Sequence, residues 1–148
     1  MSHIDEILDF VIAGEEEAAA FYRALAMDAD TPWLKELLLS FAQEEDGHRA
    51  KLLAVKGGAR LRPAGAPVID LKIADYLVDV QPGPNMSFQD ILVIAMKREK
   101  AAFKLYTDLA ARAGDAEVEA TFLSLAQEEA KHKLRFEIEY DERVLQEN

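Results

Sequence analysis

The chain has 148 residues, about the length of one domain with a substantial core, and half of them are apolar. It contains no cysteine, which excludes disulfides, iron–sulfur centres and a thiol nucleophile, and its net charge of −11 argues against nucleic acid, whose phosphates would be repelled. No apolar run approaches the roughly 20 residues of a membrane helix, and the acidic first residues do not resemble a signal peptide, so we predict a single cytoplasmic domain over residues 1–148 with no membrane partner.

The first half of the chain reads as a helical hairpin over about residues 2–56. Apolar periodicity predicts a first helix over about 2–28. Thr31 and Pro32 form a good N-cap and first-turn pair for a second helix, which we expect to end near Gly57.

A long connector follows, over about residues 57–86. Glycine and proline occur throughout it, which predicts irregular structure. One short helix is expected around Lys72–Val80.

The second half of the chain reads as another hairpin, over about residues 87–146. Ser87 is the expected N-cap of a third helix that continues to about Ala113. Gly114 and Asp115 then turn the chain into a fourth helix that reaches close to the C-terminus.

The two hairpins are related by an internal repeat of 84 residues. The segment 41–45 (FAQEE) recurs at 125–129 as LAQEE. The same offset relates Glu15 to Glu99, Tyr22 to Tyr106 and His48 to His132. Short turns within each hairpin and one long crossover between them predict an all-α, ferritin-like four-helix bundle.

Each predicted helix carries an apolar stripe that is interrupted at its middle by polar residues. The interruptions are Glu15 and Glu99 in the first and third helices, and Glu45, His48, Glu129 and His132 in the second and fourth. Glu15 and Glu45 lie 15 residues on either side of position 30, and Glu99 and Glu129 lie 15 residues on either side of Gly114. The two carboxylates of each hairpin are therefore expected at one level, and a two-fold axis would bring all four together.

Four carboxylates in an apolar core are expected to bind metal ions. Their desolvation and mutual repulsion would be prohibitive without cations, and two divalent ions would cancel the charge of four glutamates. Oxygen and nitrogen ligands without thiolate suit iron or manganese, with zinc as a further alternative. Two Glu-x-x-His motifs and two single glutamates match the di-iron carboxylate ligand set. We therefore predict two iron ions, in a binuclear non-haem centre, on the six residues at the interruptions.

Neighbouring polar residues were assigned by their position relative to the stripe. Tyr22 and Tyr106 lie on it, two turns beyond Glu15 and Glu99. Each phenol either orients a ligand glutamate and takes part in the redox chemistry, or is a core aromatic with some buried partner; the sequence leaves both readings open. Four glutamates fall off the stripe and are predicted to be solvated: Glu16, Glu17, Glu44 and Glu128.

These motifs resemble the rubrerythrin family of the ferritin-like superfamily. The resemblance lies in Glu15–Tyr22, in Glu99–Tyr106 and in the two Gln-Glu-Glu-x-x-His blocks. It implies a binuclear iron centre that hydrogen peroxide or dioxygen oxidises, in a homodimer or larger homo-oligomer. It further implies a role in peroxide scavenging or in defence against oxidative stress.

Two features depart from typical rubrerythrins. These proteins carry a rubredoxin domain with four cysteines, whereas this sequence has no cysteine, which implies an external electron donor such as a rubredoxin-like protein. They also carry a further glutamate where this sequence has Ala102, so the centre more closely resembles that of bacterioferritin, which weakens a peroxidase assignment.

The leading functional prediction is a non-haem di-iron oxidoreductase of rubrerythrin type. A ferroxidase that supplies iron storage or detoxification is the first alternative, because the same ligands serve it. A structural or metal-binding bundle without redox turnover is the second.

Overall fold

The computed structural model describes residues 3–57 and 86–145, which form helices only. In chain order these are α1 (His3–Asp28), α2 (Pro32–Gly57), α3 (Phe88–Ala111) and α4 (Ala116–Tyr140), and α4 continues into η2, a π-helical segment at Asp141–Leu145. The prediction of an all-α bundle is confirmed. The short helix expected around Lys72–Val80 lies outside the described residues.

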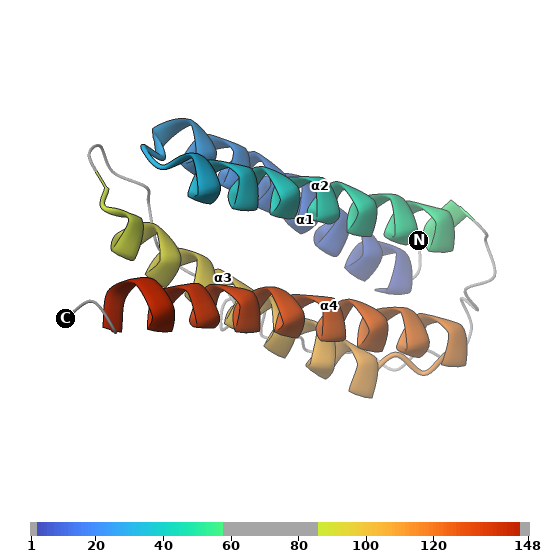
Figure 1. Ribbon diagram of the computed structural model, residues 1–148. Coiled ribbons are helices and arrows are strands. Elements are labelled where there is room, and N and C mark those ends of the chain that lie inside the picture. Colours follow the sequence, from blue (N-terminus) through green and yellow to red (C-terminus); the bar gives the residue numbers. More distant parts are fainter. Residues whose placement is uncertain (1–2, 58–85, 146–148) are drawn as a thin grey trace.

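The four helices pack as two antiparallel hairpins that lie against each other (Figure 1). The first hairpin is α1 with α2 and the second is α3 with α4. Of the described helices, α2 and α4 make the closest approach between the hairpins. Over the same residues, no helix is long and apolar enough to span a lipid bilayer.

Local signals in the sequence explain where the helices begin and end. The Ser87 side chain accepts a hydrogen bond from the Asp90 backbone N–H at 3.1 Å, and the Asp90 carboxylate accepts one from the Ser87 N–H at 3.4 Å, so both groups cap α3. Asp115 caps α4 through Glu117 and Val118. Gly114 makes the turn between them at φ +69°, a conformation that glycine adopts without strain. The third helix ends at Ala111, two residues before the predicted end, because this turn already begins at Arg112.

The apolar core consists of two clusters, one on either side of a polar middle layer. Each cluster draws on all four helices. The first includes Leu8, Val11, Leu52, Leu109 and Phe122, and the second includes Leu25, Leu34, Leu38, Leu92 and Phe136. The polar layer between them is therefore enclosed along the bundle axis by close-packed apolar side chains.

Candidate metal centre

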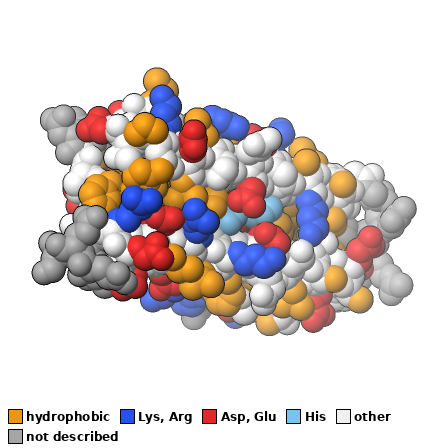
Figure 2. Space-filling model, in the orientation of Figure 1, with side chains coloured by type: hydrophobic (Ala, Val, Ile, Leu, Met, Phe, Trp, Pro, Cys, Tyr) orange, Lys and Arg blue, Asp and Glu red, His pale blue; other side chains and the backbone are white. Residues whose placement is uncertain are grey.

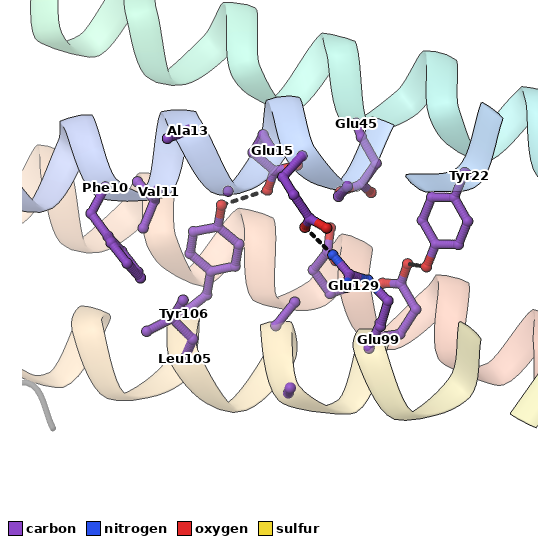
Figure 3. Close-up of a pocket in the computed structure, with 16 residues that line it drawn as sticks. Phe10, Val11, Ala13, Glu15, Tyr22, Glu45, Glu99, Leu105, Tyr106 and Glu129 are labelled. Carbon is purple, nitrogen blue, oxygen red and sulfur yellow. Dashed lines mark hydrogen bonds and ion pairs between the residues drawn. The ribbon is translucent and has the colours of Figure 1, made fainter. Parts of the chain in front are cut away.

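The six residues predicted as ligands lie together in the polar middle layer. All are buried, with exposed fractions of 1% for Glu45, Glu99 and Glu129 and at most 8% for the others. Figure 3 shows Glu15, Glu45, Glu99 and Glu129 converging on one region between the helices. Each of the four helices supplies one glutamate, and α2 and α4 also supply a histidine one turn later, on the same face.

The side-chain atoms form two groups that share two glutamates. One group is Glu15, Glu45, His48 and Glu129, and the other is Glu45, Glu99, Glu129 and His132. Within each group, one potential ligand atom from every residue lies within 4.8 Å of the others. Glu45 and Glu129 belong to both groups, so each is placed to bridge two ions. Glu15 with His48, and Glu99 with His132, complete one position each.

The distances between donor atoms suit metal ligands. His48 Nδ1 lies 3.0 Å from Glu129 Oε1, 3.5 Å from Glu15 Oε2 and 3.6 Å from Glu45 Oε1. His132 Nδ1 lies 3.3 Å from Glu45 Oε1 and 3.5 Å from Glu99 Oε1. Atoms bonded to one ion at about 2.1 Å lie roughly 3.0–3.4 Å apart at ordinary coordination angles. The two groups are thus consistent with a binuclear metal site.

Unsatisfied polar atoms provide an independent test of fit. In the part of the chain that the structure describes, seven buried side-chain nitrogen and oxygen atoms lack a hydrogen-bond partner. All seven belong to the six residues: Glu15 Oε2, Glu45 Oε1, Glu99 Oε2, Glu129 Oε1, His48 Nδ1, His132 Nδ1 and His132 Nε2. Buried polar atoms are nearly always paired in folded proteins, and each orphan costs free energy. Cations at the centre of the layer would satisfy the carboxylate oxygens and both Nδ1 atoms together.

The electrostatics of the layer show the strain of concentrating carboxylates there. Burial, together with Glu15 and Glu99, raises the pKa of Glu45 to about 9, while His132 opposes that shift. Burial and the charges of Glu99 and Glu45 raise the pKa of Glu129 well above its ordinary value. Burial lowers the pKa of His132, but hydrogen bonding to Glu45 and Glu99 outweighs it and raises the value to about 10. Without cations, therefore, the fold holds extra protons in this layer.

Glu15 behaves differently from the two shared glutamates. Burial again raises its pKa, but hydrogen bonds involving His48, Glu45 and Tyr106 and the charge of His48 outweigh burial and lower the pKa below its ordinary value. The carboxylates therefore divide into groups that favour the charged form and groups that favour the neutral form. Such a division is typical of a site that is built to bind cations.

Two tyrosines connect the hairpins through the carboxylates. The Tyr22 hydroxyl donates to Glu99 Oε1, and the Tyr106 hydroxyl donates to Glu15 Oε1. Figure 3 shows the two rings approaching the glutamates from opposite ends. Burial, with the neighbouring glutamates, raises the pKa of both phenols, so they remain donors at neutral pH. Each bond occupies one carboxylate oxygen and thereby orients the other.

Glu44, which the sequence placed in solvent, also contacts the centre. Its Oε2 lies 2.9 Å from His132 Nε2, although the two groups are not aligned as a hydrogen bond, and its side chain is 49% exposed. The opposite face of the imidazole stacks on Phe41, with ring centroids 4.5 Å apart. Together these contacts direct Nδ1 of His132 towards the carboxylates. Figure 2 shows histidine surface near the middle of the α2 and α4 face, beside acidic and basic side chains.

The first hairpin's histidine lacks the same support. Glu128 is the repeat equivalent of Glu44, but it pairs with Lys131 at 3.4 Å. The repeat equivalent of Phe41 is Leu125, which offers no aromatic ring. The two metal positions are thus unequal although their ligand sets match. The other off-stripe glutamates pair with cations at the surface, Glu16 with Arg49 and Glu17 with Arg98.

We expect Glu44→Ala to weaken metal binding more than Glu128→Ala. A carboxylate that orients a ligand histidine typically contributes about 10–100-fold in metal affinity. Titration of the metal-free protein with Zn²⁺ should show that loss in one of two binding steps for Glu44→Ala. For Glu128→Ala, the matched control, both steps should stay within about threefold of wild type. Equal losses in the two variants would show that Glu44 does not position His132.

Comparison with known proteins identifies the family. The sequence profile of the rubrerythrin family matches residues 6–140, which covers the whole of the described bundle up to the end of α4. The chain belongs to the rubrerythrin family. The resemblance recognised in the sequence is therefore confirmed, and the buried Glu and His groups of this rubrerythrin-family domain occupy its middle layer.

One solved structure shows the same fold. It is a hypothetical protein from Pyrococcus furiosus, 24% identical, with a TM-score of 0.69 over 93% of this chain and 88% of that one. At this identity the match supports the fold of this rubrerythrin-family chain and not an activity. A search of curated proteins gives no match.

Proposed function

We propose that this protein is a non-haem di-iron oxidoreductase in which hydrogen peroxide or dioxygen accepts electrons from a pair of iron ions. The observation that carries the proposal is the pair of buried groups that share Glu45 and Glu129. Membership of the rubrerythrin family supports it. The −4 charge of four glutamates balances two divalent ions, and the two imidazoles add neutral ligands.

Iron is the metal that we propose, with manganese and zinc as alternatives. The donor set is oxygen and nitrogen only, which suits divalent iron and manganese. When bound, an iron pair supplies two electrons to an oxidant that has an O–O bond. An external donor such as a rubredoxin-like protein would return those electrons, since the chain has no cysteine for an iron–sulfur centre of its own. We also propose a homodimer or larger homo-oligomer.

The chain's own residues would hold and isolate the pair. Glu45 and Glu129 would lie between the ions, while Glu15 with His48 and Glu99 with His132 would hold one ion each. Tyr22 and Tyr106 would fix the outer glutamates from across the bundle. The two apolar clusters would exclude water along the axis, which strengthens electrostatic interactions inside the layer.

The test is to mix the anaerobic protein, loaded with two Fe(II) per chain, with peroxide and separately with dioxygen in a stopped-flow spectrometer. We expect ferric absorbance to develop with at least one oxidant while iron stays at two per chain. Faster oxidation by peroxide would support peroxide scavenging. Continued iron uptake far above two per chain would favour a ferroxidase instead. Failure of both oxidants to change the spectrum would contradict redox turnover.

A further inference from the structure

A cavity of about 420 Å³ lies between α1 and α3 and ends at the candidate metal centre. Its inner end is formed by Glu15, Glu45, Glu99 and Glu129. The remaining described walls come from α1 and α3 and are mostly apolar, including Phe10, Val11, Ala18, Ala102 and Leu105. Figure 3 shows Phe10, Val11 and Leu105 on one side of the four carboxylates. The cavity thus joins an apolar compartment to the site of the proposed chemistry.

Small residues produce this space. Ala18 and Ala102 occupy stripe positions where most equivalents are leucine, phenylalanine or tyrosine, and they are repeat partners 84 residues apart. Both are only partly buried, whereas the stripe residues that flank them, such as Tyr22 and Tyr106, are buried. A Cβ added at Gly14 would meet nothing within 4 Å. The bundle is therefore hollow next to the carboxylates on this side.

The size and polarity of the cavity exceed what a small oxidant requires. Hydrogen peroxide and dioxygen occupy about the space of one or two water molecules, at about 30 Å³ each. The observed volume falls within the roughly 300–1,000 Å³ of pockets that bind organic molecules. Arg98 is a cation in the described lining, but it pairs with Glu17 and lies 4.1 Å from the centroid of the Phe21 ring. The walls therefore favour an uncharged, apolar ligand over an organic anion.

We infer that the cavity binds the apolar body of an organic hydroperoxide and presents its O–O group to the carboxylate layer. This inference rests on the proposed function, because the reduced iron pair is the reductant. The O–O bond of ROOH breaks, two electrons come from the two Fe(II) ions, and two protons complete the products ROH and water. The substrate class of the site then includes alkyl or aryl hydroperoxides as well as hydrogen peroxide.

Binding is tested without turnover, on zinc-loaded protein with 2-phenyl-2-propanol, the alcohol that cumene hydroperoxide yields. Ligand-observed NMR should detect binding to wild type. Ala18→Leu, which fills the cavity, should weaken it at least about tenfold. Ala20→Leu lies two residues away on the exposed side of α1 and should bind like wild type. Ala102→Leu on α3 is a second cavity-filling variant in case the first loses zinc. No binding to wild type, or equal binding by the cavity-filling and control variants, would overturn the inference.

Turnover then separates this inference from the proposed function. With Fe(II)-loaded wild type, cumene hydroperoxide should give ferric absorbance, and its rate relative to hydrogen peroxide should fall about tenfold in Ala18→Leu. Oxidation by hydrogen peroxide alone, with the same rate in both proteins, would overturn the inference and leave the proposed function intact. Failure of every oxidant would overturn both, although alcohol binding to the zinc protein would still identify the cavity as an apolar site.

Discussion

Replacement of Glu129 by alanine is expected to abolish the binding of two metal ions, whereas replacement of Glu15 should leave one. The reason is geometric: Glu129 belongs to both groups of potential ligands, while Glu15 belongs to one. Glu45→Ala should behave like Glu129→Ala, and Glu99→Ala like Glu15→Ala. For the shared glutamates we expect both affinities to fall by more than about 100-fold, beyond the usual effect of a residue that only orients a ligand.

The measurement is metal stoichiometry by anaerobic titration with Fe(II), and with Zn²⁺ as a redox-inert probe. Glu16→Ala is the matched control, because Glu16 follows Glu15 in sequence but lies at the surface, 2.6 Å from Arg49 Nε. It should bind two ions with wild-type affinity. Two ions retained by Glu129→Ala would contradict the shared position, and two ions retained by all four variants would contradict the whole ligand assignment.

Loss of metal in these variants will not be a consequence of unfolding. Removing a buried carboxylate from a crowded acidic layer relieves desolvation and repulsion, so the metal-free variants should unfold at temperatures no lower than the metal-free wild type. Thermal unfolding by circular dichroism checks this. A shared-glutamate variant that is much less stable than the metal-free wild type would show that Glu129 or Glu45 has a structural partner of another kind.

The fold and the position of the candidate centre were predictable because the repeat and the helix period constrain both. Glu15 and Glu45 lie at one level because antiparallel helices with a short turn place equidistant residues side by side. Gly114, Asp115 and Ser87 mark helix ends by chemistry that acts within a few residues, so they can be read locally. Such signals need no knowledge of how the hairpins pack.

Contacts between the hairpins could not be predicted in the same way. Which glutamates are shared depends on the offset between α2 and α4, and nothing in either helix alone encodes it. Glu44 was predicted to be solvated because its position falls off the stripe, yet its side chain reaches His132 of the other hairpin. Long side chains extend past the helix face that carries them, so period alone misplaces them.

The cavity was missed for a related reason. Alanine on an apolar stripe predicts burial, and Ala18 and Ala102 were counted as core. Whether an alanine is covered depends on the distance between the helices around it, which the sequence does not state. Here α1 and α3 are held apart, and the small side chains leave space that they cannot fill.

The metal-free protein is expected to lose stability as pH rises from about 5 to about 9. Glu45 has a pKa of about 9 in the fold against an ordinary 4.5, so the folded state holds a proton that the unfolded chain has already released in this range. His132, with a pKa of about 10 against 6.5, adds to the effect above pH 6.5. Because the folded state binds more protons, the free energy of unfolding falls with pH, by about 1.4 kcal/mol per unit for each such proton.

The lowered pKa of Glu15 does not reverse this trend, because its contribution to stability is already present above its ordinary value of 4.5 and is lost only at lower pH. The melting temperature of the metal-free protein should therefore fall by roughly 10 °C between pH 5 and pH 9. In Glu45→Gln, which cannot ionise at this position, the slope should be smaller.

Bound metal should reverse the sign of the pH dependence. Cations compete with protons for the same carboxylates and imidazoles, so stabilisation by Zn²⁺ grows as the pH rises and the ligands lose protons more easily. The melting curves of metal-free and zinc-loaded protein should diverge steadily from pH 5 to pH 9. A metal-free protein that becomes more stable over this range would show that the carboxylates of the middle layer are not protonated in the fold, and the balance of protons and cations proposed for the layer would then fail.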